Sequence, residues 1–309
     1  MDFSIVIPTY NRADILARTL AALAGQHSEF EGRTLLFEVI VVNDGSRDHT
    51  EEWVLAWQKD STVPLTYLRQ TNQKQGAARN FGASRAEGRL LIFLGDDTVP
   101  APNFLIEHWK SHRQNESGKA VIGYTPWPAE IRPTSFMRYI GEEGWQFGFS
   151  LIDDPEDVPF NFFYTSNISL DRRFFLNSGG FDEDFREYGW EDVELSLRLK
   201  QQGMRLTYNP HAIAYHFHPT SLRDFSRRQR KVGYSAWTLY AKHPELARFL
   251  NIDQVQQYGA IARLRLELLA ALCSLTEKWE WLDLSRYYPD LMSYYYNLGL
   301  LEADRSVHQ

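Results

Sequence analysis

Several features are scarce or absent in this 309-residue sequence, and each absence narrows the range of functions. Cys273 is its single cysteine, which excludes an internal disulfide framework and fits a reducing compartment. No uncharged apolar run is long enough to span a bilayer, and the first residues lack the basic region and the length of a secretory signal. We therefore expect a soluble, cytoplasmic protein.

Positive charge and glycine-rich nucleotide motifs are scarce as well. The formal net charge is −7, whereas binding to the phosphate backbone of a nucleic acid requires a basic face. No Gly-x-Gly-x-x-Gly follows the first predicted strand, and no Walker A sequence occurs. The sequence thus argues against a nucleic-acid partner and does not favour a dinucleotide-dependent dehydrogenase.

Short apolar runs alternate with helical patterns over the first third of the chain. The runs predict strands at Ser4–Pro8, Phe37–Asn43, Leu65–Leu68 and Leu90–Leu94. Helices are predicted at Arg12–Ala24, Trp53–Trp57, Gly76–Ala86 and Pro102–His112. Thr9 or Asn11 is expected to cap the first helix, and Asp48 with Glu51 has capping-box spacing before the second. This alternation predicts an α/β fold with a mostly parallel central sheet flanked by helices.

The pattern changes after residue 120. Residues 127–163 are rich in Pro, Gly, Trp and Phe without a regular period, and we expect them to form long ordered loops. A helix at Trp190–Gln202 is predicted to end at Gly203 in a left-handed cap. The spacing of Leu, Tyr and Trp predicts mostly helix from residue 222 onward. We therefore expect one α/β domain at residues 1–220 and a helical C-terminal extension at 221–309.

Two adjacent carboxylates end the predicted strand Leu90–Leu94. Asp96 and Asp97 follow Gly95, and open α/β sheets bind ligands beyond the carboxyl ends of their strands. A metal or nucleotide site would compensate the two charges. A solvated Gly-Asp-Asp turn is the alternative, because these are ordinary turn residues.

Two further loops, at residues 6–12 and 42–48, follow predicted strands and open at the same sheet edge. A helix that begins near Gly76 adds a positive charge, Arg79, to these loops. Asp44 follows the strand Phe37–Asn43 and either accepts hydrogen bonds from a ligand or only forms a turn. Gly76 lets a helix N-terminus approach a ligand closely, and Arg79 then pairs with a diphosphate or with Asp96. A well-packed helix start with a surface Arg explains the same residues.

Two carboxylates also open the helix of residues 190–202. Glu191 and Asp192 follow Trp190 in its first turn, where the helix dipole favours acids for purely structural reasons. The dipole is expected to lower the pKa of a carboxylate there and keep it ionised. An aromatic ring beside two acids also suits a sugar, and an ionised carboxylate can act as a general base.

Two histidines alternate along the predicted strand of residues 212–218. His216 and His218 therefore share one face of the strand and are available to a metal, although a strand histidine is usually an ordinary polar residue. Carboxylates combined with an imidazole suit Mn²⁺ somewhat better than Mg²⁺.

Taken in order, six segments of this sequence resemble the inverting glycosyltransferases of the GT-A fold, family 2 type. The segments are IVIPTYNR, VIVVNDGSRDHT, QGAARNFGASRAEG, LIFLGDDTVPAPNFL, GGFDEDF and GWEDVELSLRLKQQG. The later part of the match is similar to the motif of galactosyltransferases and N-acetylgalactosaminyltransferases. The resemblance implies transfer of a sugar from a nucleotide-diphosphate sugar, UDP favoured, to a hydroxyl of a saccharide or glycolipid acceptor.

The resemblance also assigns roles to residues of this chain. Residues 1–120 would bind the nucleotide and residues 121–220 would hold the acceptor and the catalytic group. The nucleotide would be bound by Pro8, Thr9, Asn11, Arg12, Asp44, Gly76, Arg79 and Asp96. Gly95 replaces the first acid of the family's Asp-x-Asp element, so Asp97 with His216 would hold Mn²⁺ or Mg²⁺. Asp192 would be the catalytic base, and Glu191 would help to hold the acceptor.

Acceptor binding and membrane contact are less determined by the sequence. Trp127, Trp145 and Trp190 are candidate platforms for a sugar ring, although any one of them is as readily a core residue. The basic stretch Ser221–Trp237 either packs as a solvated helix face or contacts an anionic membrane peripherally. A catalytically inactive nucleotide-sugar-binding protein and a sugar-phosphate nucleotidyltransferase remain alternative functions. The sequence leaves the oligomeric state open.

Overall fold

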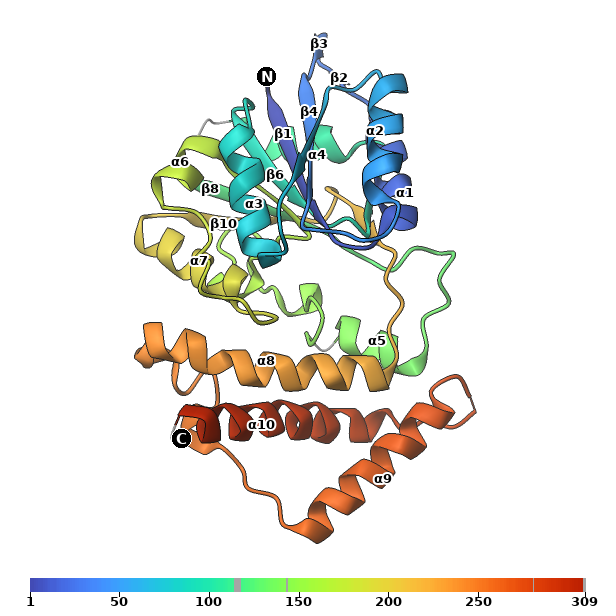
Figure 1. Ribbon diagram of the computed structural model, residues 1–309, viewed down its shortest axis with the longest axis vertical. Coiled ribbons are helices and arrows are strands. Elements are labelled where there is room, and N and C mark those ends of the chain that lie inside the picture. The colour runs from blue at the N-terminus through green and yellow to red at the C-terminus, as the bar shows by residue number, and fades with distance from the viewer. Residues whose placement is uncertain (114–117, 143, 280, 308–309) are drawn as a thin grey trace. The chain divides into compact units, whose positions relative to one another are not determined.

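The computed structural model describes residues 1–113, 118–142, 144–279 and 281–307, which divide into two compact units (Figure 1). The first unit comprises Met1–Ile131, Phe147–Glu183 and Glu191–His218. The second comprises Arg132–Gln146, Asp184–Trp190 and Pro219–Gln309. The predicted helical extension thus falls in the second unit, which also contains two segments from earlier in the chain.

A seven-stranded sheet forms the centre of the first unit, in the order β10-β8-β9-β6-β1-β4-β5. Its strands are β1 (Phe3–Thr9), β4 (Phe37–Asn43), β5 (Leu65–Arg69), β6 (Leu90–Leu94), β8 (Lys119–Gly123), β9 (Asn167–Asp171) and β10 (Arg205–Asn209). All neighbours pair in parallel except β9, which is antiparallel to both β6 and β8. The predicted mostly parallel sheet is confirmed.

Helices cover both faces of this sheet (Figure 1). They are α1 (Ala13–Ala24), α2 (Thr50–Asp60), α3 (Lys74–Arg85), α4 (Phe104–Ser111), α6 (Arg172–Asn177) and α7 (Glu191–Gln201). Alternate residues of each central strand enter two separate apolar cores: in β6, Leu91 and Phe93 face one core, and Leu90 and Ile92 face the other. A strand buried on both faces therefore reads as a continuous apolar run.

Two short antiparallel ribbons accompany the main sheet. One pairs β2 (Glu29–Phe30) with β3 (Arg33–Thr34), and the other pairs β7 (Thr98–Pro100) with β11 (Ala214–His216). The strand β11 lies within the predicted strand of residues 212–218, whereas β7 was not predicted. The second ribbon ties the segment after β6 to a segment more than a hundred residues later.

The caps predicted for α1, Thr9 or Asn11, were wrong, whereas Asp48 does bind the start of α2 as predicted. Arg12 precedes α1 and His49 precedes α2, and neither makes a side-chain capping bond. Instead, Asp48 Oδ2 accepts from the backbone N–H of Ala13 (3.3 Å), and Asp48 Oδ1 accepts from the backbone N–H of Thr50 (3.1 Å). One carboxylate thus accepts hydrogen bonds at the starts of both α1 and α2. The bond to Ala13 joins residues far apart in the sequence, so a capping-box spacing does not predict it.

A buried polar network holds α4 against β9. His112 Nε2 and His108 Nδ1 each lie 2.8 Å from Ser169 Oγ, and His108 Nε2 lies 3.0 Å from Asn167 Oδ1. The amide of Asn167 then donates to the carbonyl of Ala212 (2.9 Å). Burial lowers the pKa of His108 to about 4 and that of His112 to about 3, so both imidazoles are neutral near pH 7.

The second unit is helical. It contains α5 (Ser135–Glu142), α8 (Leu222–Lys242), α9 (Ala260–Thr276) and α10 (Tyr288–Val307), and α8 lies side by side with α10 (Figure 1). Gly233 and Gly299 make this pairing close, because a Cβ on Gly233 would meet the carbonyl of Tyr296 at 2.0 Å. The helix α5 corrects the prediction of loops throughout residues 127–163.

Short 3₁₀ turns and the basic stretch complete the description. The turns are Phe149–Leu151, Phe160–Phe162, Pro244–Leu246, Ile252–Gln254 and Ser285–Tyr287. In the basic stretch, Arg230 pairs with Glu302, and Arg228 donates to Gln146 (2.8 Å). Among the described residues, no helix combines the length and the apolar character that crossing a membrane requires.

Candidate active site

The carboxyl ends of the central strands meet at one edge of the sheet. β1 ends at Thr9, and β6 is followed by Asp96 and Asp97. Because β9 runs antiparallel to β6, its first residues lie at the same edge, where the backbone N–H of Gly95 donates to the carbonyl of Ser166 (3.1 Å). Segments far apart in the sequence thus converge here.

Asp96 and Asp97 form a buried carboxylate pair bound by Arg12. The Thr9 hydroxyl donates to Asp96 Oδ2 (2.8 Å), and Arg12 Nη1 donates to Asp96 Oδ1 (3.3 Å) and to Asp97 Oδ2. Burial, followed by the charge of Asp97, raises the pKa of Asp96 to about 7. Burial also acts to raise the pKa of Asp97, but two nearby histidines and Arg12 outweigh it and lower that pKa.

Gly95 occupies the position of the first acid in the Asp-x-Asp element. A Cβ there would lie 2.6 Å from Thr98 Oγ1 and 3.1 Å from Asp97 Oδ1. A larger residue would therefore require one of these side chains to move. Glycine at this position leaves room for Asp97 in its present conformation.

The β7–β11 ribbon brings the predicted histidines to Asp97. Its register places Thr98 opposite His216, and the backbone N–H of Phe217 donates to the carbonyl of Asp97 (2.8 Å). His216 Nε2 lies 3.8 Å and His218 Nδ1 lies 3.7 Å from Asp97 Oδ2. Both imidazoles thus face the same carboxylate oxygen.

This donor set has the chemistry of a divalent-cation site. A carboxylate oxygen faces imidazole nitrogens, a combination that suits Mn²⁺ and, less well, Mg²⁺. Arg12 already places a positive charge on the same oxygen. Among the described residues, no three or more His, Cys, Asp or Glu side chains form a complete metal-binding group. Asp97 and His216 therefore fit as a partial ligand set that a bound ligand would have to complete.

Asp44 lies buried at the N-terminus of α3. Its Oδ1 accepts from the side chain of Gln70 (2.7 Å) and from the backbone N–H of Gln73 (2.8 Å), and its Oδ2 accepts from the backbone N–H of Lys74 (3.0 Å). A carboxylate oxygen can accept two hydrogen bonds. Asp44 thus caps α3 while Oδ2 has capacity for one more donor.

The other predicted nucleotide-binding residues lie on the adjoining loops. Pro8 is half-buried near the end of β1, and Asn11 has a positive φ of 54°. Asn11 Oδ1 accepts from the backbone N–H of Arg47 (2.7 Å), which joins the loops after β1 and β4. The space beside Gly76 is taken by Phe181, since a Cβ on Gly76 would lie 3.3 Å from that side chain.

Arg79 is the buried cation of a second cluster at this edge. Its Nη1 lies 3.4 Å from Glu191 Oε1 and 3.7 Å from Asp192 Oδ1, and its Nη2 donates to Gln75 Oε1 (3.0 Å). The guanidinium also lies over the ring of Phe181, 5.4 Å from its centroid. Arg79 thus pairs with the acids of α7, and the partner of Asp96 is Arg12.

Thr165 holds Asp192 in place. Its backbone N–H donates to Asp192 Oδ2 (3.1 Å), and its hydroxyl lies 2.8 Å from Oδ2 and 3.0 Å from Oδ1. Sequence reasoning missed this residue, because a threonine just before a strand has no distinguishing pattern. Only the antiparallel path of β9 brings Thr165 to the start of α7.

The two acids of α7 have raised pKa values. Burial, followed by the charge of Asp192, raises the pKa of Glu191 to about 7. Burial also raises the pKa of Asp192, although Arg79 and the two bonds from Thr165 act in the opposite direction. The expectation that the helix dipole lowers the pKa of these carboxylates was wrong, because desolvation outweighs it.

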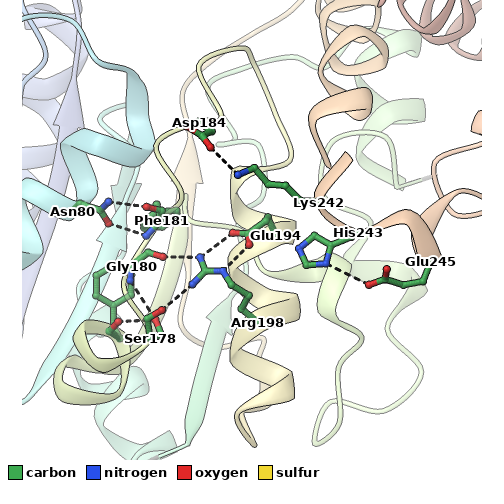
Figure 2. A network of polar contacts seen from close by, with 11 residues as sticks. Asn80, Ser178, Gly180, Phe181, Asp184, Glu194, Arg198, Lys242, His243 and Glu245 are labelled. Carbon is green, nitrogen blue, oxygen red and sulfur yellow. Dashed lines mark hydrogen bonds and ion pairs between the residues drawn. The ribbon is translucent and has the colours of Figure 1, made fainter. Parts of the chain in front are cut away.

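Arg198 connects α7 with the turn that carries Phe181 (Figure 2). Its Nε and Nη2 donate to the two carboxylate oxygens of Glu194 (2.6 and 2.8 Å), while Nη1 donates to the carbonyl of Ser178 (2.9 Å) and Nη2 to that of Gly180 (2.6 Å). Asn80 of α3 exchanges two hydrogen bonds with the backbone of Phe181. The network fixes the positions of α3 and α7, which carry Arg79 and Asp192.

The three predicted tryptophan platforms lie in different surroundings. The Trp127 ring lies in the first unit, 5.1 Å from the ring of His216 with an interplanar angle of 35°. Trp145 and Trp190 belong to the second unit. The indole N–H of Trp145 donates to the hydroxyl of Tyr139 (2.8 Å), and that of Trp190 to the carbonyl of Val232 (2.8 Å).

Two protein-family profiles match this chain. The profile of glycosyl transferase family 2 matches residues 4–176, and that of the N-terminal domain of galactosyltransferase matches residues 156–220. The two matches together span the strands and helices that carry both acidic clusters.

Curated proteins similar to this chain include a glucosyltransferase and a polysaccharide synthase. The chain is 33% identical over 225 residues to validoxylamine A glucosyltransferase of Streptomyces hygroscopicus subsp. jinggangensis, an alignment that covers 66% of this chain and 52% of that protein. It is 28% identical over 281 residues to chondroitin synthase of Escherichia coli, covering 79% of this chain and 39% of that protein. The chain spans about half the length, or less, of these relatives.

The structural likeness extends over nearly the whole chain. The mannosyltransferase PcManGT from Pyrobaculum calidifontis, solved in complex with GDP-Man and Mn²⁺, has a TM-score of 0.63 at 18% identity and covers 97% of this chain and 86% of its own. TarS 1–349 of S. aureus in complex with UDP has a TM-score of 0.56 at 18% identity and covers 99% and 92%. The predicted GT-A fold is confirmed, and the family profile extends over more than half of the sequence. The chain belongs to glycosyl transferase family 2.

Proposed function

We propose that this chain is an inverting glycosyltransferase that moves a sugar from a nucleoside-diphosphate sugar to an acceptor hydroxyl. One observation carries the proposal: the bond from Gly95 to Ser166 places the segment of Asp96 and Asp97 beside the segment of Thr165, which binds Asp192. The carboxylate pair that we propose to bind the cation and the proposed base thus lie at the same sheet edge.

The carboxylate pair and its neighbours suit a diphosphate leaving group. Departure of a nucleoside diphosphate builds negative charge on its oxygens, which nearby positive charge stabilises. A divalent cation held by Asp97 and His216 would supply that charge together with Arg12. Thr9, Asn11 and Pro8 would line the nucleotide pocket, and the remaining acceptor capacity of Asp44 Oδ2 suits an N–H of the base.

The second cluster suits proton transfer from the acceptor. Asp192, held by Thr165, would accept the proton of the attacking hydroxyl, and attack opposite the leaving group inverts the anomeric centre. The raised pKa of Asp192 increases its basicity over that of an exposed aspartate. Arg79 limits this increase, and Glu191 would hold the acceptor.

The nucleotide and the metal are proposed from the relatives. Similar structures contain GDP-Man with Mn²⁺, UDP, and UDP-GlcNAc. We favour UDP as the donor nucleotide and Mn²⁺ or Mg²⁺ as the cation. Saccharides or glycolipids are the proposed acceptors, with Trp127, Trp145 and Trp190 as candidate sugar platforms. Peripheral membrane contact through α8 stays a prediction.

Thermal unfolding with UDP, GDP and dTDP, each with and without Mn²⁺, tests the donor site. A ligand present at about a hundred times its dissociation constant adds about 2.7 kcal/mol of stability. We expect one nucleotide to stabilise the protein more when Mn²⁺ is present. Asp97→Ala should abolish the metal-dependent part, and Asp153→Ala, which removes an exposed carboxylate, should retain it. Equal stabilisation with and without metal would contradict the role of Asp97.

Asp192→Asn tests the proposed base separately. The variant should keep metal-dependent nucleotide binding, because Asp192 lies in the other cluster. It should lose sugar transfer by about 10² to 10⁴-fold, the usual effect of removing a general base. Near-normal turnover would refute the assignment of Asp192. Nucleotide binding without any turnover of donor sugars in the unmodified chain would instead favour a binding protein.

A further inference from the structure

The helix α9 of the second unit exposes a continuous apolar face. Five aliphatic side chains form this face, and each is between 48% and 79% exposed. The exposed residues are Ile261, Leu264, Leu268, Leu272 and Leu275. An apolar stripe in a soluble protein normally faces a core, so a face of this length marks an interaction surface.

The opposite side of α9 is anchored within its own unit. Ala270 and Cys273 are buried, and the Glu267 carboxylate accepts from the hydroxyls of Tyr294 (3.1 Å) and Tyr295 (3.0 Å). These contacts set the rotation of the helix about its axis. The apolar face therefore points outward because of packing and is not the result of a helix left unsupported. Figure 1 shows α9 diverging from the α8–α10 pair.

The exposed residues are spaced symmetrically about Leu268. Leu264 and Leu272 lie four residues to either side, and Ile261 and Leu275 lie seven residues to either side. A two-fold axis through Leu268 pairs each of them with an apolar residue of an antiparallel second copy. Spacings of three and four residues are also those of a helix-pairing seam.

We propose that α9 is a self-association surface, on which α9 of a second copy of this chain packs antiparallel about Leu268. This arrangement is isologous, so both copies bury the same residues and the assembly closes at two. The proposal is independent of the transferase function.

The exposed area is of the size that a dimer requires. Trp279 and Trp281, stacked with ring centroids 5.5 Å apart, follow α9 in the chain and are 49% and 78% exposed. At about 150–250 Å² for a whole aromatic side chain, they expose on the order of 250 Å². The five aliphatic side chains of α9 add an area on the order of 400 Å², which brings the surface near the roughly 800 Å² per partner of a stable interface.

A lipid surface fits this face less well. Helices that lie on membranes carry many Lys and Arg beside the apolar face, and anionic lipids attract net positive charge. Arg265 is the charged residue beside the apolar face of α9, and the chain as a whole carries a net charge of −7.

Sedimentation velocity on charge variants of Leu268 tests the proposal. The unmodified chain should self-associate to a dimer between about 1 and 100 μM, the weaker end of the range for interfaces of this size. Leu268→Glu and Leu268→Lys should each weaken this association at least about tenfold, because a central interface residue would become charged. Since the two Leu268 side chains meet at the axis, mixing the two variants should restore a dimer. Leu36→Glu, at a leucine of similar exposure (57% against 62%), should have no effect.

Crosslinking tests the direction of the pairing. In an equal mixture of Ile261→Cys and Leu275→Cys chains, a short bismaleimide should join the two variants to each other, and neither variant should join to itself. Crosslinking of Ile261→Cys to itself would indicate a parallel pair and overturn the antiparallel arrangement.

Two other outcomes would overturn the proposal altogether. The first is a monomer at every concentration for the unmodified chain. The second is co-sedimentation with phosphatidylserine vesicles that Leu268→Glu abolishes while self-association is absent, which would assign α9 to a lipid surface.

Discussion

The ion pair of Arg198 and Glu194 allows a quantitative test of what holds the active-site helices together. Glu194 is 3% exposed, and both of its oxygens accept from one guanidinium (Figure 2). Arg198→Met removes the cation and leaves a buried carboxylate without it. Breaking a buried pair from one side costs about 3–5 kcal/mol, so we expect a loss of unfolding free energy of that size.

The assay is urea unfolding followed by circular dichroism, with the free energy extrapolated to water. Lys200→Met is the matched control, because Lys200 lies on the same helix and pairs with the exposed Asp157 at 3.3 Å. A surface pair contributes about 0–1 kcal/mol. The double variant Glu194→Leu with Arg198→Met should be more stable than Arg198→Met alone, since it removes the buried charge as well as its partner.

A loss for Arg198→Met within about 1 kcal/mol of the control would refute this reasoning, since it would place the pair in the energetic class of surface pairs. A double variant less stable than Arg198→Met would refute it in another way. It would mean that Glu194 is stabilised by contacts independent of the guanidinium.

Two further predictions concern protonation. Thr165→Val removes a hydroxyl that donates to the Asp192 carboxylate, a charge-assisted hydrogen bond of about 1.5–3 kcal/mol. The acid limb of the kcat/KM profile should therefore move up by about 1–2 pH units, while Thr165→Ser should leave it in place. An unchanged limb in the valine variant would contradict the assignment of Asp192 as base. The lowered pKa values of His108 and His112 mean that unfolding takes up protons as pH falls from about 6.5 toward 4, so stability is lost in that window. His112→Gln removes one of the two histidines that take up a proton on unfolding. Between pH 6 and 4.5, the unfolding free energy of this variant should depend on pH less steeply than that of the unmodified chain, by about 1.4 kcal/mol per pH unit. Equal slopes would show that His112 is not buried in its neutral form.

Local patterns determined the framework of the first unit. The strands predicted at Phe37–Asn43 and Leu90–Leu94 are observed with the same bounds. A strand buried on both faces has apolar residues at successive positions, and such a run is recognisable in the sequence. Gly203 ends α7 with a φ of +91°, as expected for a residue that adopts the left-handed region without steric cost. The ordered motifs were sufficient to predict the family and the GT-A fold.

Long-range contacts decided how the site is assembled. His216 reaches Asp97 only because β7 and β11 pair; the sequence predicted a strand around β11 but neither β7 nor this pairing. Thr165 reaches Asp192 only because β9 runs against its neighbours. The carboxylates of α7 have raised pKa values because packing removes water from them. This desolvation depends on tertiary packing and cannot be predicted from the position of an acid in a helix. The symmetric spacing on α9 was present in the sequence, but only the packing of Ala270 and Cys273 inward shows that this face is turned to solvent.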